Sequence, residues 1–247
     1  MVVSILGSAG WMPSKGRETA CVMVRGENTL LLLDAGTGVS NLSHYESLLD
    51  NYETVYVFLS HYHLDHTIGI CYLCKWFRNT DIVFLVPGKQ ENGRTARAVL
   101  DSLLNPESFS LKLDEIASSV RIMEYQEFVP FAAGEFTLEA KKQVHSSPSF
   151  AVMVDNAICY ATDTIADYAT FEWAHEVKAI FHECWSINKD DSAHSSFEEL
   201  SELMKHIDDG QLFLVHQNPD LSIQNYMGLC KTNPNVVVAE DLMTVEL

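Results

Sequence analysis

Short apolar runs broken by glycine and polar turns fill the first sixty positions of the chain, a pattern typical of β-strands. The runs are rich in valine, isoleucine and leucine. They predict strands at about 2–6, 20–25, 29–33 and 54–60. The N-terminal part of the chain is therefore expected to build a β-sheet.

The periodicity changes in the middle of the chain. Residues 66–78 carry apolar side chains at helical spacing, and residues 82–86 form a buried strand that ends at Pro87-Gly88. The segment 89–118 has the weakest pattern, with a helix near 94–104 followed by Asn105-Pro106-Glu107. We expect an insertion, a lid or a dimer contact in this segment.

Strand patterns return from residue 120 and then alternate with helical ones. Strands are expected at 120–125, 135–144, 149–154, 157–162, 178–183, 211–216 and 236–239, and helices at 165–176 and 195–208. Asp155-Asn156 is expected to form a hairpin turn. Two halves, each with strands followed by helices, predict an α/β (α+β) chain. We expect a four-layer sandwich in one domain, residues 1–247, with two sheets packed together and helices outside.

Composition narrows the classes of partner. The 247 residues are 47% hydrophobic, which suffices for a large core, and 34 acidic against 16 basic residues give a formal charge of −18. This charge makes extended nucleic-acid binding unfavourable, although a small anionic substrate stays compatible with a site that metal ions dominate. With neither a long apolar stretch nor the pattern of a signal peptide, we expect a cytoplasmic protein without membrane association.

The sequence His61-Tyr62-His63-Leu64-Asp65-His66 directly follows the apolar run 55–60. It places four metal-ligand side chains within six residues at the end of a predicted strand. Imidazole nitrogen and carboxylate oxygen suit a borderline ion such as zinc, and a strand end gives a loop with a fixed root and open access. A catalytic metal site is therefore expected here.

Three further candidates occupy the same kind of position. His145, Asp163 and His216 each follow an apolar strand. Brought together with the first motif, they would supply one ion with His61, His63 and His145, and a second ion with Asp65, His66 and His216. Asp163 would bridge both. Each of two ions about 3.5–4 Å apart would keep a position for water, so that a bridging hydroxide can form.

With these residues the chain resembles the metallo-β-lactamase superfamily of hydrolases, specifically its ribonuclease Z-like branch of phosphodiesterases. The similar segments are Ile5–Gly10, Leu31–Gly38, Tyr160–Thr164, His182-Glu183, His194-Ser195 and the tail Val238–Leu247. The resemblance runs from end to end. It implies the αββα sandwich of the metallo-β-lactamase fold and the ligand set named above.

Two departures from the tRNA-maturing members of this branch affect the expected substrate. Those members resemble this chain but carry a long basic arm between the third histidine and the bridging aspartate, whereas only about seventeen residues separate His145 from Asp163 here. His216 is followed by Gln217-Asn218-Pro219, not by an aromatic and basic ending. Both differences disfavour tRNA 3′-processing and favour a phosphodiesterase for small or cyclic phosphodiesters.

The catalytic roles follow from this chemistry. A metal-bridging hydroxide is the expected nucleophile, and Asp65 would orient it as well as bind metal. His194 is the candidate for protonating the leaving oxygen, with Glu183 holding its ring, as a similar pair does in the ribonuclease Z-like branch. The alternative is that Glu183 caps a strand end and that His194 is the exposed start of the helix 195–206.

Four residues are candidates for supporting roles. Asp34 would fix the histidine loop, or it is a turn residue before Ala-Gly-Thr-Gly. Lys15 or Arg17 would pair with a substrate phosphate while Trp11 covers an apolar or base moiety, the alternative being a solvated loop.

Two divalent ions are expected, with zinc favoured and manganese or iron compatible with the same ligands. Rival functions are hydrolysis of a lactone, thioester or sulfate ester, iron-dependent oxidoreduction on the same scaffold, and a binding module without turnover. A homodimer is expected only at the level of the family.

Overall fold

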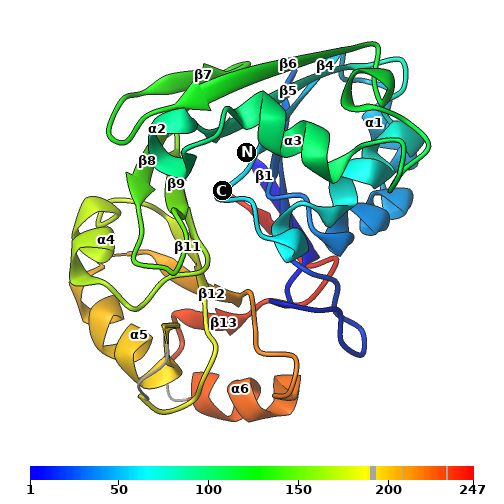
Figure 1. Ribbon diagram of the computed structural model, residues 1–247. Helices are drawn as coiled ribbons and strands as arrows, with labels where there is room; N and C mark the ends of the chain where they lie inside the picture. The colour runs from blue at the N-terminus through cyan, green and yellow to red at the C-terminus, as the bar shows by residue number, and fades with distance from the viewer. Residues whose placement is uncertain (190–192, 208, 232) are drawn as a thin grey trace.

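The computed structural model consists of two seven-stranded sheets that face each other, with helices on the outer sides (Figure 1). It describes residues 1–189, 193–207, 209–231 and 233–247. The first sheet has the order β14 (Thr244–Glu246), β1 (Val2–Gly7), β2 (Cys21–Arg25), β3 (Leu30–Leu33), β4 (Thr54–Phe58), β5 (Asp81–Pro87) and β6 (Ser119–Tyr125). The second has the order β13 (Val236–Val238), β12 (Gln211–Val215), β11 (Ala179–Glu183), β10 (Ile158–Ala161), β9 (Phe150–Val154), β8 (Phe136–Lys142) and β7 (Phe131–Ala133).

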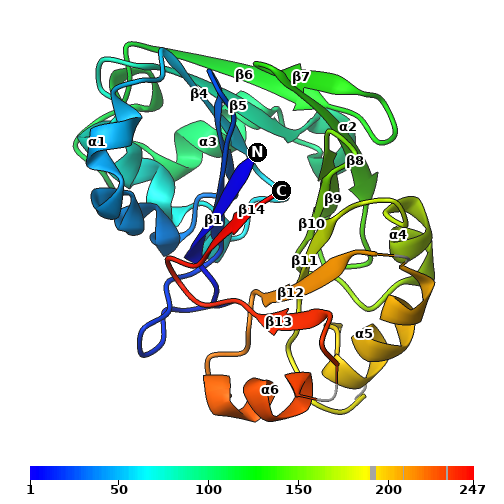
Figure 2. The ribbon, with the colours of Figure 1, turned by 180° about the vertical axis from the view of Figure 1, so that it is seen from behind.

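Both sheets are mixed in the same way. Strands β3 to β6 pair in parallel in the first sheet, and β10 to β13 pair in parallel in the second, while the other neighbours are antiparallel. Parallel strands end at one edge of a sheet, which is where ligand sites of such sheets form. Figure 2, from behind, shows β1 and β14 side by side near the chain termini.

The helices cover the outer faces. The N-terminal half contains η1 (Thr37–His44), α1 (Glu46–Leu49), η2 (Leu64–His66), η3 (Ile68–Lys75), α2 (Lys89–Asn92), α3 (Ala96–Leu103) and η4 (Leu113–Glu115). The C-terminal half contains α4 (Tyr168–Trp173), α5 (Phe197–Leu203), η5 (Met204–His206) and α6 (Ile223–Cys230). None of the helices in the described part of the chain combines the length and apolar character needed to span a bilayer.

Alternation within the strands creates the layers. In β3, Leu31 and Leu33 pack between the two sheets, whereas Leu30 and Leu32 pack against the helices outside the first sheet. Phe181 of β11 also lies in the core between the sheets, stacked on Phe213 with ring centroids 4.8 Å apart. The predicted four-layer sandwich is thus confirmed.

The segment after the histidine motif differs from the prediction. Residues 66–78 were expected to form one helix, but the chain makes the 3₁₀ segments η2 and η3. Gly69 explains the close packing there, because a Cβ at this position would lie 2.1 Å from the carbonyl oxygen of Gly36. Tertiary packing of this loop against residues 35–36 therefore overrides the helical pattern.

Other elements deviate in their ends. The expected helix 165–176 is the shorter α4, and the expected helix 195–208 is α5 with η5, its last residue lying outside the described residues. The segment 89–118 forms α2, α3 and η4, and its Leu100 and Leu113 are buried in the outer core of the first sheet. Its role as a lid or dimer contact stays a prediction.

Candidate metal centre

The histidine motif follows β4 and turns at the edge of the first sheet. The amide of Leu59 donates to the carbonyl of Leu85 on β5, which extends the strand pairing to the start of the motif. The amide of His66 then donates to the carbonyl of His63, closing a tight 3₁₀ turn. This turn brings the side chains of Asp65 and His66 together, with Oδ2 of Asp65 3.3 Å from Nε2 of His66, whereas in an extended strand they would point to opposite sides.

The remaining candidate ligands come from strand ends of the second sheet. His145 lies in the loop after β8, Asp163 follows β10 and His216 follows β12. Asp163 and His216 adopt the left-handed backbone region, with φ of 49° and 45°. Non-glycine residues are rarely held there, and such strain is concentrated at functional sites.

The seven predicted ligands converge into two adjoining groups. One comprises His61, His63, His145 and Asp163, the other Asp65, His66, Asp163 and His216, and within each group one ligand atom per residue lies within 4.8 Å of the others. Asp163 belongs to both. The two groups are the same two sets that the sequence analysis assigned to two ions.

Asp34 holds the rings of His66 and His61 in place, the first directly and the second through Ser60. Its Oδ2 atom lies 2.7 Å from Nδ1 of His66 and accepts a 2.8 Å hydrogen bond from Oγ of Ser60. Oγ of Ser60 also lies 3.0 Å from Nδ1 of His61. Because the single hydroxyl proton of Ser60 points to Asp34, Ser60 accepts from His61, which fixes the Nδ1–H tautomer and leaves Nε2 with its lone pair.

The chemistry of the donor set fits a metal ion. Nε2 of His61 is buried and has no hydrogen bond to any described residue, and it lies 3.6 Å from Oδ2 of Asp163. A buried lone pair without a partner is costly unless a cation or water satisfies it. Imidazole nitrogens and carboxylate oxygens are ligands for zinc and similar divalent ions.

The surrounding carboxylates favour positive charge in the cluster. Burial alone would lower the pKa of His216, but Asp163, Asp65 and Glu183 raise it to about 10. The pKa of His66 is likewise raised despite burial, by Asp34, Asp163 and Asp65. The group that contains His66 and His216 therefore favours positive charge, whereas in the other group burial lowers the pKa of His61 and of His145.

The cluster has a closed side and an open side. His66 and His216 are buried, whereas His63 is exposed and Asp65 is half-buried. Oγ of Ser147 lies 3.1 Å from Nε2 of His63 at the open side. The cluster is therefore open to solvent on the side of His63.

Glu183 and His194 form the predicted pair. Nδ1 of His194 lies 2.8 Å from Oε2 of the fully buried Glu183, and the amide of Thr164 donates to Oε1 of Glu183 at 2.7 Å. Burial by itself lowers the pKa of His194, whereas the hydrogen bond to Glu183 raises it, and the net direction is upward. The arrangement presents the Nε2 edge of His194 away from Glu183.

Sequence reasoning missed Trp185. Its ring stacks on His194 with centroids 4.8 Å apart and an interplanar angle of 24°, and it lies 6.0 Å from the ring of His216. The available signal was an aromatic residue two positions after Glu183, the last residue of β11. This residue shields one face of His194 from solvent.

The loop of residues 11–17 adjoins the cluster, and its three candidate residues differ in exposure. Trp11 is 64% exposed, and its backbone amide donates to Oδ2 of Asp65 at 2.8 Å, so the loop does adjoin the cluster. Lys15 is exposed. Arg17, in contrast, is buried and its guanidinium donates to protein acceptors, which differs from the expected pairing with a substrate phosphate.

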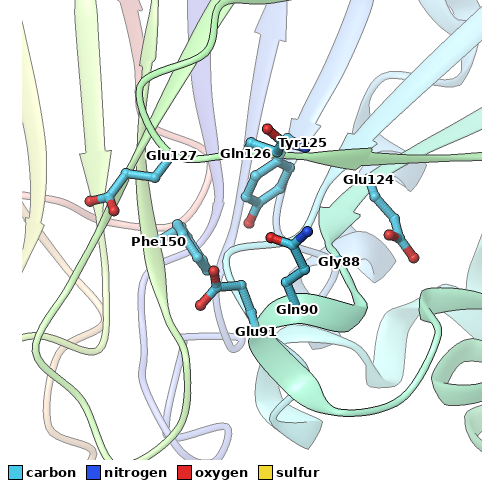
Figure 3. Close-up of a pocket in the computed structure, with 8 residues that line it drawn as sticks. All are labelled: Gly88, Gln90, Glu91, Glu124, Tyr125, Gln126, Glu127 and Phe150. Carbon is cyan, nitrogen blue, oxygen red and sulfur yellow. The ribbon is translucent and has the colours of Figure 1, made fainter.

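A cavity of about 200 Å³ is lined by Tyr125, Phe150 and six further residues, none of them from the histidine loop, residues 59–66 (Figure 3). Its wall is tied to that loop, since the hydroxyl of Tyr125 donates to the carbonyl of Leu59 and the amide of Phe150 donates to that of Ser60. Glu91, Glu124 and Glu127 line the cavity. These carboxylates disfavour an anionic group in this cavity.

Comparisons with known proteins agree with this fold. The chain is similar to a ribonuclease Z of Nanoarchaeum equitans, with 24% identity over 99% of this chain and 93% of that protein. Among solved structures, the metallo-β-lactamase fold protein YhfI of Bacillus subtilis superposes with a TM-score of 0.76 at 18% identity, covering 99% of each chain. A diphosphatase of the PhnP family superposes with a TM-score of 0.75 at 13% identity, covering 100% of this chain and 97% of that one.

These relatives have the metallo-β-lactamase fold, and those with named activities are hydrolases, which supports a metal-dependent hydrolase. A more specific match comes from a family model. The model described as "Anti-Pycsar protein Apyc1" matches residues 1–231. The chain therefore belongs to the Anti-Pycsar protein Apyc1 family.

Proposed function

We propose that this protein is a phosphodiesterase with a dinuclear metal centre that acts on a small or cyclic phosphodiester. The observation that carries the proposal is the sharing of Asp163 between two adjoining ligand groups. A shared carboxylate between two nitrogen-rich groups is the arrangement that holds two divalent ions close together. Zinc is the favoured ion, and manganese or iron suits the same ligands.

In this proposal the first ion is held by His61, His63 and His145, and the second by Asp65, His66 and His216, with Asp163 common to both. When bound, the ions would neutralise phosphate charge and lower the pKa of a coordinated water from about 15.7 toward about 7, which supplies the nucleophile. The protein fixes ring orientation through Asp34 and leaves access at the exposed side of His63.

His194 is proposed to deliver a proton to the leaving oxygen. Glu183 accepts from Nδ1 of His194, so we assign the proton to be transferred to Nε2, the ring nitrogen that faces away from Glu183. Trp185 limits the motion of the ring by stacking on it. Asp65, whose Oδ2 accepts from the amide of Trp11, is proposed to orient the attacking water as well as to bind metal.

The compact loop between His145 and Asp163 supports a small substrate. Strands β9 and β10 and the turn at Asp155-Asn156 fill this stretch, which leaves no room for a long basic arm. The net charge of −18 also disfavours a long polyanion. Trp11, exposed beside Asp65, is proposed to cover an apolar or base moiety, and Lys15 to approach its phosphate.

A second candidate is tRNA 3′-processing, which is favoured by the similarity to ribonuclease Z along 99% of the chain. The two candidates differ in substrate size and salt dependence. Cleavage of a precursor tRNA would weaken steeply with salt because phosphate contacts release counterions, whereas cleavage of a small phosphodiester would not.

The deciding experiment combines metal analysis with a substrate panel. The metal content of the purified protein is measured first, and the protein is then assayed on linear and cyclic phosphodiesters, lactones, thioesters, sulfate esters and a precursor tRNA. Two ions per chain and turnover only of small phosphodiesters are expected. Turnover of another ester alone, oxygen consumption by an iron-loaded sample, or no bound metal would each overturn the proposal. Light scattering on the same sample tests the expected homodimer.

A further inference from the structure

Arg17 is a buried cation that connects two loops. It is 5% exposed, its Nε donates to Oγ of Ser14 at 3.0 Å, and its Nη2 donates to the carbonyl of Leu221 at 2.9 Å. Its Nη1 donates to Oε1 of Gln217 at 2.9 Å. One guanidinium thus joins the loop after β1 to the segment that follows His216.

Gln217 accepts this hydrogen bond from Arg17, and its other polar groups are hydrogen-bonded as well. Its side-chain Nε2 donates to the carbonyls of Leu214 and Ala239, both at 2.7 Å, and the side chain is fully buried. Its backbone amide donates to the carbonyl of Ser8, and its carbonyl accepts from the amide of Gly10. Because Arg17 donates to Oε1, both the oxygen and the nitrogen of the Gln217 side-chain amide are hydrogen-bonded.

His216 directly precedes Gln217 and depends on this arrangement. Its φ of 45° lies in the left-handed region. This conformation costs free energy, and it persists only where contacts with the neighbouring chain enforce it. The ring packs against Gly10, where an added Cβ would lie 2.5 Å from the imidazole. The contacts of Gln217 and Gly10, together with Oε2 of Glu183 at 3.4 Å from Nδ1, therefore restrict where Nε2 of His216 points.

We propose that Arg17 is a positioning residue for the second metal subsite, acting on His216 through Gln217. The inference rests on the proposed dinuclear centre and assigns Arg17 to metal binding instead of substrate binding. A guanidinium suits this task because its fixed fork reaches Ser14, Gln217 and Leu221 at once, which the single ammonium of lysine cannot do. Loss of the fork leaves buried acceptors unpaired and removes the partner of Oε1 of Gln217, which loosens the side chain next to His216.

The test measures metal affinity rather than turnover. The wild type and the variants Arg17→Ala and Arg17→Lys are titrated with Zn²⁺ against a chromogenic chelator, and thermal unfolding of each metal-free protein checks its folding. Arg17→Ala should weaken one of the two bound equivalents by about 10–100-fold and leave the other within about 3-fold, with Arg17→Lys only partly restoring it. Arg97→Ala is the matched control. Arg97 is an exposed arginine of α3, and it pairs with Asp101 and Asp114, neither of which is a candidate ligand.

The outcomes separate the inference from the proposed function. A wild type without two metal equivalents would remove the proposed function. A wild type with two equivalents and an Arg17→Ala variant of unchanged affinity for both would overturn only the positioning role. A raised KM in Arg17→Ala with intact metal affinity would instead assign Arg17 to a substrate phosphate. If Arg17→Ala does not fold, Gln217→Met tests the same path, since it removes the acceptor for Arg17 while keeping the side-chain length, and unchanged metal affinity in that variant contradicts the inference.

Discussion

Oδ2 of Asp34 lies 2.7 Å from Nδ1 of His66, and both side chains are fully buried. The same carboxylate accepts hydrogen bonds from the amide and the hydroxyl of Ser60, which in turn contacts His61. A single buried charge thus fixes the orientation of one candidate ligand in each group.

Replacing the carboxylate of Asp34 should weaken metal binding, although Asp34 itself is not one of the candidate ligands. Asp34→Asn keeps the shape but loses the charge and one acceptor, so the affinity for both ions is expected to fall by about 10–100-fold. Competition with a chelator measures the change. Asp155→Asn, in the β9–β10 turn, is the control that alters charge away from the cluster, and equal effects of the two variants would contradict the assignment.

The role of Glu183 predicts a change in the pH profile. Because Glu183 raises the pKa of His194, Glu183→Gln lowers it. A proton donor must be protonated to act, so activity is lost as pH rises through its pKa, and the alkaline limb of the profile should move to lower pH in the variant.

The leaving group provides a second readout for this pair. Glu183→Gln should slow substrates with an alkoxide leaving group by about 10–100-fold or more, and substrates with a nitrophenolate much less, since nitrophenolate departs without protonation. Metal content is measured in parallel because Oε2 of Glu183 lies 3.4 Å from Nδ1 of His216. His175→Asn, at an exposed histidine, should leave the profile as it is.

The core between the sheets should dominate stability. Phe181 is fully buried and stacks on Phe213, so Phe181→Ala is expected to lower the free energy of unfolding by about 3–5 kcal/mol. Met123, 45% exposed on β6, provides the comparison. Met123→Ala should change the free energy of unfolding by less than about 1 kcal/mol. Urea unfolding followed by circular dichroism measures both, and similar losses would argue against the sandwich core.

The β9–β10 turn should tolerate glycine but not valine. Asp155 and Asn156 have φ of 50° and 52°, which is the geometry of a tight hairpin turn. Asn156→Val is expected to cost about 1–2 kcal/mol because its branched side chain clashes in the left-handed region, while Asn156→Gly stays near the wild type. Denaturant midpoints of the two variants should therefore differ, and identical midpoints would contradict the turn.

The strands could be predicted from the sequence because their apolar patterns match their burial. The leucines of β3 are buried on both faces, and a continuous apolar run is typical of such a strand. Short or weakly patterned elements could not be found this way: β7 and β14 have three residues each, and α6 depends on packing around Tyr226. The 3₁₀ turns after β4 depend on contacts of Gly69 that are distant in sequence.

The convergence of the candidate ligands could be predicted because their side chains follow strand ends, as at Asp163 and His216. Arg17 could not, because a charged residue in a polar loop gives no sign that it will be buried on Gln217. Trp185 was missed for a similar reason, since only the folded chain shows that it stacks on His194. Pairwise contacts between distant loops are therefore the part of the site that required coordinates.

The shared aspartate provides the most direct test of the dinuclear centre. Metal content and phosphodiester turnover are measured for the wild type and for Asp163→Ala after equal loading with Zn²⁺. The account predicts two ions per chain in the wild type, loss of at least one ion in the variant, and a fall in turnover of more than about 100-fold. An Asp163→Ala protein that keeps both ions and the wild-type turnover would contradict it.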